Sequence, residues 1–280
     1  MERKPAVSGI FYASNLVKLR EQIQNLFLHV EGPGKIPEPV HEPLKNSVGV
    51  MLPHAGYVCS GPIAADGLAQ VSQHGVPSTI VLLGPSHTGM GKPVSVWDRG
   101  EWQTPFGTVQ VDHELSQKFL DLYDYARVNY DAHVGEHSLE VQLPLLQFVY
   151  GQDFRILPIA MMDQRKETAR EMASVFQELK KDRPLLFVAS SDMNHYQAEQ
   201  ETLEKDDHVL QAVLEMDVEK MYAAISEYEV SMCGFGPVAT LLLSGLGTPR
   251  LVKHVTSAKT CTDQRHVVGY ASVVFDSHTP

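Results

Sequence analysis

The chain is poor in cysteine and in positive charge, and it lacks long apolar runs. Its three cysteines are an odd number without a Cys-x-x-Cys pair, so a disulfide framework is not expected, and Cys59 and Cys261 are predicted to be buried free thiols. Lysine and arginine total 23 against 34 aspartates and glutamates, and the net charge of −11 argues against a nucleic-acid or anionic-membrane surface. No segment is apolar for long enough to span a bilayer, and no apolar signal-peptide core follows the first residues. We therefore expect a cytoplasmic protein that binds neither nucleic acid nor membrane.

Strand-like and helix-like patterns alternate along the chain without a linker-like interruption. Short apolar runs predict buried strands, and apolar residues at helical spacing predict the helices between them. The hydrophobic content of 43% is ample for a core. These patterns favour a single α/β domain over residues 1–280, with a central mostly parallel or mixed sheet flanked by helices.

The expected element boundaries follow from capping residues and turn signals. Ser14 or Asn15 can cap the first helix, residues 31–42 should form a Pro- and Gly-rich loop, and Pro144 either kinks its helix or marks a late start. The expected helices are 16–27, 60–71, 139–149, 166–180, 202–214, 218–226 and 238–244, and the expected strands are 48–52, 79–83, 155–161, 185–189, 251–256 and 267–275, with 93–96 and 108–111 as a hairpin or as edge strands.

Polar side chains follow three of the predicted strands, each close to the point where the strand ends. His54, His87 and the pair Asp192 and His195 occupy these positions. A lone histidine at a strand end is more often a hydrogen-bonded or exposed residue than a ligand, but the carboxyl ends of neighbouring strands in an α/β sheet share one crevice. Imidazoles and a carboxylate that converge in a crevice suit a first-row transition metal. The sequence therefore predicts a shared metal or catalytic site.

A third metal ligand is predicted at Cys233, which precedes an expected helix. A helix N-terminus lowers a thiol pKa and favours the thiolate that binds metal, although a buried structural cysteine is the alternative interpretation. His137 lies at a loop tip that can reach the crevice and is predicted, with His195, to transfer protons. Asp192 is predicted to orient an imidazole. Other histidines in ordinary helix or strand patterns receive no role, namely His113, His208, His254 and His266.

Short motifs in this order resemble the signature segments of the Memo-like family, whose prokaryotic members are called AmmeMemoRadiSam system protein B. The matching segments are PAVSGIFY at 5–12, PHAGY at 53–57, GPSH at 84–87, WQTPFG at 102–107, EHSLE at 136–140, SSDMNH at 190–195 and CG at 233–234. They extend over essentially the whole chain. An ordered set of this kind is specific, whereas each motif alone would be weak.

The resemblance implies a fold similar to that of the class III extradiol dioxygenases, which hold non-haem Fe(II) on two histidines and a glutamate. In the Memo-like pattern a cysteine replaces the glutamate, and the matching positions here are His54, His87 and Cys233. Polar residues lining the same pocket match His137, Asp192 and His195. A soft thiolate also suits copper or zinc. Eukaryotic members are described as iron- or copper-binding redox proteins and as binders of phosphotyrosine peptides, and the prokaryotic name implies association with a radical SAM protein and an AMMECR1-like protein.

Three functional hypotheses follow from these residues. The first is a cytoplasmic mononuclear Fe(II) oxidoreductase or dioxygenase-like enzyme that binds O₂ and substrate at open metal positions. The second is a non-enzymatic metal-binding module that recognises a peptide or a phosphorylated ligand in the same pocket, although the acidic balance offers a phosphate few partners. The third is a metal-dependent hydrolase in which Asp192 and His195 position water.

The substrate is expected to be a small molecule or a peptide, and an aromatic ring is one candidate feature of it. Aromatic residues near the motifs could line a pocket that suits a ring, and the alternative is that they belong to the core. These residues are Tyr57, Trp102, Phe106, Tyr196 and Phe235.

Overall fold

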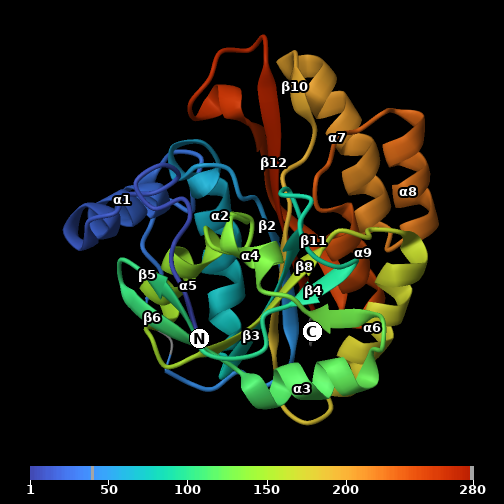
Figure 1. Cartoon of the computed structure of the whole chain (residues 1–280). Coiled ribbons are helices and arrows are strands. Elements are labelled where there is room, and N and C mark those ends of the chain that lie inside the picture. Colours follow the sequence, from blue (N-terminus) through green and yellow to red (C-terminus); the bar gives the residue numbers. More distant parts are fainter. Residues whose placement is uncertain (39–40, 278–280) are drawn as a thin grey trace.

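The computed structural model describes residues 1–38 and 41–277 and contains one large mixed sheet between two layers of helices (Figure 1). The strands are β1 (Glu2–Arg3), β2 (Val48–Leu52), β3 (Thr79–Pro85), β4 (Val94–Val96), β5 (Glu101–Thr104), β6 (Gly107–Val111), β7 (Ala126–Val128), β8 (Arg155–Met161), β9 (Leu186–Ser190), β10 (His195–Gln197), β11 (Thr248–Thr256) and β12 (Val267–Asp276). The α-helices are α1 (Leu16–Leu28), α2 (Tyr57–Val71), α3 (His113–Leu122), α4 (Asp131–Val134), α5 (Gln142–Tyr150), α6 (Lys166–Leu179), α7 (Glu199–Leu214), α8 (Val218–Glu227) and α9 (Phe235–Leu243), and the 3₁₀ helices are η1 (Ser72–His74) and η2 (Ser257–Lys259).

The centre of the sheet is parallel, as the apolar runs predict. Strands β8, β3, β9 and β2 lie side by side in the same direction, and β12 continues the sheet antiparallel to β2. Strands β2, β3 and β9 are buried along their whole length because helices cover both faces. Their carboxyl ends therefore lie at one edge of the sheet. His54, His87 and Asp192 follow these three ends.

Alternation along the strands divides the core into two clusters. On β3, Val81 and Leu83 pack in the cluster with α3, α6, α7, α8 and α9, whereas Ile80 and Leu82 pack with α1, α2 and α5. Figure 1 shows these two groups of helices on opposite sides of the sheet. In the part of the chain that the structure describes, no helix is both long and apolar enough to cross a membrane.

Most of the expected helices and strands are present, and the differences concern where helices begin and which short strands pair. Asn15 caps α1 by accepting from the N–H groups of Val17 and Lys18. Helix α5 begins at Gln142, so Pro144 lies in its first turn, and the late start is the correct alternative. The hairpin forms between β5 and β6, whereas β4 pairs with β7 and β8. The expected loop at 31–42 includes residues 39–40, which lie outside the described residues.

The prediction of free thiols is wrong for Cys59 and Cys261, which form a disulfide. The bond joins the first turn of α2 to the segment after η2, across 202 residues of sequence, and Cys233 is free. The two residues carry no spacing signal because their proximity arises only when α2 packs against β11 and β12. A cross-link over so long a loop stabilises the fold by roughly 2–5 kcal/mol.

Candidate metal centre

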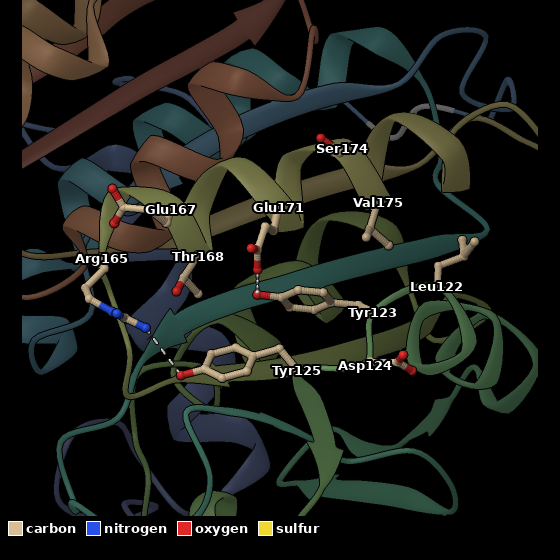
Figure 2. A pocket seen from close by; sticks show the side chains of 10 residues that line it. All are labelled: Leu122, Tyr123, Asp124, Tyr125, Arg165, Glu167, Thr168, Glu171, Ser174 and Val175. Carbon is tan, nitrogen blue, oxygen red and sulfur yellow. Dashed lines mark hydrogen bonds between the residues drawn. The ribbon is translucent and has the colours of Figure 1, made fainter.

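A surface groove beside α6 contains none of the predicted site residues. It has a volume of about 680 Å³ and lies between α6 and the connection from α3 to β7 (Figure 2). Several of its polar groups are paired, because the Tyr123 hydroxyl donates to Glu171 at 3.2 Å and Arg165 contacts both Tyr125 and Asp163. The predicted site residues lie elsewhere, at the carboxyl edge of the parallel strands.

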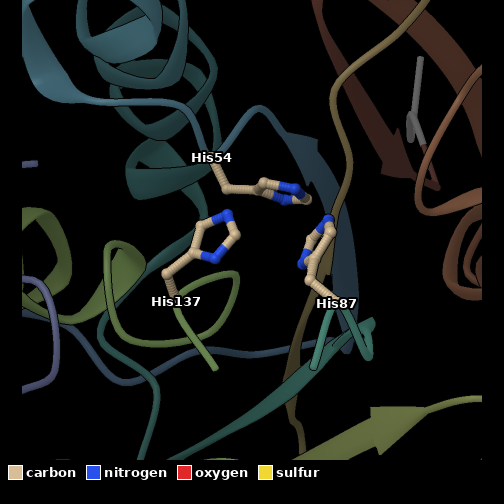
Figure 3. Close-up of side chains that lie close together, drawn as sticks. All are labelled: His54, His87 and His137. Atoms are coloured by element: carbon tan, nitrogen blue, oxygen red, sulfur yellow. The ribbon is translucent and has the colours of Figure 1, made fainter. Parts of the chain in front are cut away.

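Three histidines converge at that edge (Figure 3). His54 follows β2, His87 follows β3 and His137 lies between α4 and α5, and their ligand nitrogens are all within 4.8 Å of one another. The rings of His87 and His137 stack with centroids 4.5 Å apart, and the His54 ring meets both edge-on. His137, predicted to transfer protons, therefore lies close enough to the other two to act as a metal ligand.

The ring of His54 is held by a serine hydroxyl. Its Nδ1 lies 2.9 Å from Ser190 Oγ, and that hydroxyl donates its own proton to the Ser138 carbonyl at 2.6 Å. Nδ1 must therefore carry the ring proton, which leaves Nε2 with a free lone pair. Burial lowers the pKa of His54 well below its usual value, and the neighbouring histidines lower it further. His54 is thus neutral, as a metal ligand must be.

Glu136 holds His87 in the same way. Its Oε1 accepts from His87 Nδ1 at 2.8 Å, and its Oε2 accepts from the His87 backbone N–H at 2.5 Å. Burial would raise the pKa of Glu136, but these bonds to His87 and one from the Ser138 N–H lower it to about 2. In many metal sites the ring N–H of a histidine that does not bind the metal donates to a carboxylate, which fixes the orientation of the ring. No local feature of the sequence shows which histidine Glu136 contacts, so this role is visible only in the folded structure.

Cys233 contacts the histidine cluster through His54. Its Sγ lies 3.2 Å from His54 Nε2 and accepts the Asp192 backbone N–H at 3.2 Å. Burial and the Asp192 charge raise the pKa of this thiol, so the expectation of a lowered pKa is wrong for the metal-free protein. The physical reason is its position, since α9 begins only at Phe235 and the helix N-terminus does not offset desolvation. A metal would have to displace the thiol proton.

Asp192 and His195 lie next to the cluster, but neither contacts the ring of His54 or His87 through a hydrogen bond that the described residues show. Asp192 accepts the backbone N–H of His54 at 2.7 Å, and burial raises its pKa to about 6. It therefore orients the peptide of His54, whereas Ser190 orients the imidazole. His195 directs Nδ1 to the Ser231 carbonyl at 2.9 Å, and its charge would lower the pKa of His54.

Known proteins resemble this chain over almost its whole length. A family model described as Memo-like protein matches residues 3–274. The chain belongs to the Memo-like family. It is 45% identical to a MEMO1 family protein of Thermotoga maritima over 276 residues, which cover 98% of this chain and 99% of the relative, and 39% identical over 282 residues to one of Sulfurisphaera tokodaii, with the same shares covered. An uncharacterized protein of Escherichia coli K12 shares the fold, with a TM-score of 0.56 and 13% identity over 82% of this chain and all of that one.

In this Memo-like protein an N-terminal arginine braces the loop that carries His137. Arg3 is buried and pairs with the buried Glu140, with Nη1 and Oε2 2.7 Å apart. It also donates to the backbone carbonyls of His133 and Glu136, each at 2.7 Å. Its guanidinium lies 4.2 Å from the ring centroid of Trp102. Arg3 therefore fixes both ends of the segment between α4 and α5, a role that the sequence pattern did not reveal.

Of the two interpretations of the aromatic residues near the motifs, the core location is correct for Tyr57 and Trp102. Tyr57 and Trp102 are fully buried in the core, and Tyr196 is 74% exposed. An aromatic ring that does contact the cluster is that of Phe11, whose centroid lies 4.9 Å from that of His137. The N-terminal segment, which Arg3 anchors, thus also supplies the apolar wall beside the histidines.

Proposed function

We propose that this Memo-like protein is a cytoplasmic mononuclear non-haem metal oxidoreductase, dioxygenase-like in its chemistry, with Fe(II) on His54, His87 and Cys233. The observation that carries the proposal is the pair of imidazoles whose Nδ1 atoms are fixed by Ser190 and Glu136, with the Cys233 sulfur 3.2 Å from His54 Nε2. Such a nitrogen and sulfur donor set fits a first-row transition metal, with copper and zinc as competitors. Bound Fe(II) would supply redox chemistry with O₂ at positions that the protein leaves open.

The remaining polar residues handle protons in this proposal. His195 donates from Nδ1 to the Ser231 carbonyl, so its Nε2 is free to accept a proton from a substrate. Burial lowers the pKa of His137, so this imidazole is neutral and can also accept a proton. The substrate is a small molecule or a peptide with an aromatic ring. A radical SAM protein and an AMMECR1-like protein are the proposed partners, because the motifs resemble those of AmmeMemoRadiSam system protein B.

The third ligand is tested by counting protons during metal titration. Because the pKa of Cys233 is raised, the thiol is protonated near neutral pH, and metal binding through sulfur should release about one proton per ion and strengthen roughly tenfold per pH unit. His137 is already neutral, so ligation by His137 in place of Cys233 would release no thiol proton and leave the affinity nearly flat with pH. The titration belongs above about pH 7, where Asp192, with a pKa of about 6, is ionised.

Two matched variants decide between the thiol and the imidazole. We expect Cys233→Ser to abolish the proton release and Cu(I) binding, and His137→Gln to preserve both. Cys233→Glu should favour Fe(II) over Cu(I), because it rebuilds a two-histidine, one-carboxylate set. Unchanged proton release in Cys233→Ser would show that the sulfur is not a ligand.

The redox activity is tested by O₂ uptake after anaerobic loading with Fe(II). With catechol as a ring-bearing probe, the iron-loaded protein should consume O₂, and the metal-free and zinc-loaded proteins should not. The rate should fall by roughly two to four orders of magnitude in His195→Ala while the metal content stays constant. Equal O₂ uptake with iron and with zinc would contradict an oxidoreductase function.

A further inference from the structure

His195 is held by a series of hydrogen bonds, here called the frame, that begins in the preceding residue, Asn194. Asn194 is almost fully buried, and its Oδ1 accepts from both the backbone N–H and the hydroxyl of Ser231, each at 3.1 Å. Ser231 in turn contacts His195 twice, because its hydroxyl accepts the His195 backbone N–H at 2.8 Å and its carbonyl accepts from His195 Nδ1 at 2.9 Å. The segment that carries His195 and the segment that leads to Cys233 are therefore joined through Asn194.

The frame is anchored on a carboxylate from another element. Asp206, in the middle of α7, is fully buried, and its Oδ1 accepts the Asn194 backbone N–H at 2.9 Å. Its Oδ2 lies 3.1 Å from Nε2 of His254 on β11. Gly269 makes room for this carboxylate, since a Cβ there would lie 1.8 Å from Asp206 Oδ2. Removing a carboxylate from water costs free energy even when hydrogen bonds satisfy both of its oxygens. The burial of Asp206 therefore indicates a specific role for its hydrogen bonds.

We propose that Asp206 is a positioning residue for His195. By fixing the peptide of Asn194 it places the Asn194 side chain against Ser231, and Ser231 then holds His195 as the neutral tautomer with its proton on Nδ1. A carbonyl oxygen can only accept a hydrogen bond, so this geometry leaves Nε2 as the basic nitrogen. The inference rests on the proposed role of His195 in proton transfer, but the tautomer can be measured without metal, substrate or turnover.

The test is the tautomer of His195, read from ¹⁵N shifts of the metal-free full-length protein at a pH where the imidazole is neutral. In the unaltered protein we expect the proton on Nδ1. Asp206→Ala removes the hydrogen bond from the Asn194 N–H. The loss of about one such bond should shift the tautomer ratio of His195 roughly fivefold toward the Nε2–H form. Asp206→Asn keeps an acceptor oxygen for the Asn194 N–H and should restore the original ratio.

Matched controls separate positioning from general stability. Asp207 contacts the other nitrogen of His254, whereas the Asn194 N–H is bound by Asp206, so Asp207→Ala should leave the His195 tautomer unchanged. Val213→Ala, at a buried position two turns along α7, lowers stability without touching the frame and should also leave it unchanged. Ser231 is exposed, so Ser231→Ala will fold, and it should shift the ratio in the same direction as Asp206→Ala.

The outcomes distinguish this inference from the proposed function. A proton on Nε2 of His195 in the unaltered protein overturns the inference whether or not Asp206→Ala folds. An unchanged ratio in a folded Asp206→Ala protein does the same. A shifted ratio in a protein that binds no metal would leave Asp206 as the positioning residue and contradict the metal assignment instead.

Discussion

A chain in which both His54 and His87 are replaced by alanine will lose tight metal binding while it keeps its fold. The free energy of a filled transition-metal site is roughly 10–16 kcal/mol and is shared among its ligands, so removing two of them should weaken binding by more than about a thousandfold. Both residues lie beyond the ends of strands β2 and β3, so no strand pairing depends on their side chains, and the His87 side chain is partly exposed. Metal analysis after anaerobic purification measures the loss, and circular dichroism checks the fold.

The control removes two histidines outside the site. His113 contacts the Asp98 carbonyl and His208 stacks on Tyr228, and neither of these partners belongs to the histidine cluster. The double variant His113→Ala, His208→Ala should bind metal as the unaltered protein does. Full occupancy in the His54→Ala, His87→Ala protein would refute the assignment of both ligands.

Replacement of Arg3 by methionine should cause a large loss of stability, because Arg3 and Glu140 form an ion pair in which both side chains are buried. It leaves Glu140 buried without its cation, and breaking a buried pair in this way costs about 3–5 kcal/mol of unfolding free energy. The loop between α4 and α5 also loses two backbone hydrogen bonds, so Glu136 and His137 should lose their fixed positions. We expect metal affinity to fall by roughly 10–100-fold, as for other losses of ligand support. Denaturant unfolding and metal titration measure the two effects.

An exposed arginine provides the matched control for this prediction. Arg265 pairs with Asp263, and both side chains are exposed, at 81% and 56%, so Arg265→Met should change the unfolding free energy by no more than about 1 kcal/mol. In a double-mutant cycle, Glu140→Gln should recover part of the stability lost in Arg3→Met because it removes the unpaired charge. A loss below about 1 kcal/mol in Arg3→Met would mean that the brace is not a stabilising pair.

The strands and the ends of strands are the part of this protein that its sequence determines. The apolar runs that become β2, β3, β8 and β9 are short and uninterrupted, which is the pattern of strands buried on both faces, and Asn15 marks the start of α1 through its own side chain. The positions of His54 and His87 follow directly, since each comes after such a strand. These features are local, because periodicity and capping depend on residues within a few positions of one another.

Tertiary structure alone decided the partners of these residues. Arg3 and Glu140 are 137 positions apart, Cys233 and His54 are 179 apart, and Cys59 and Cys261 are 202 apart. Packing also determines the pKa of the Cys233 thiol. The position of Cys233 just before a helix predicts a lowered pKa, but burial in the folded protein raises it. A sequence pattern specifies which face of an element is apolar, but contacts over such separations depend on how the elements pack, and packing also sets the desolvation that governs charge.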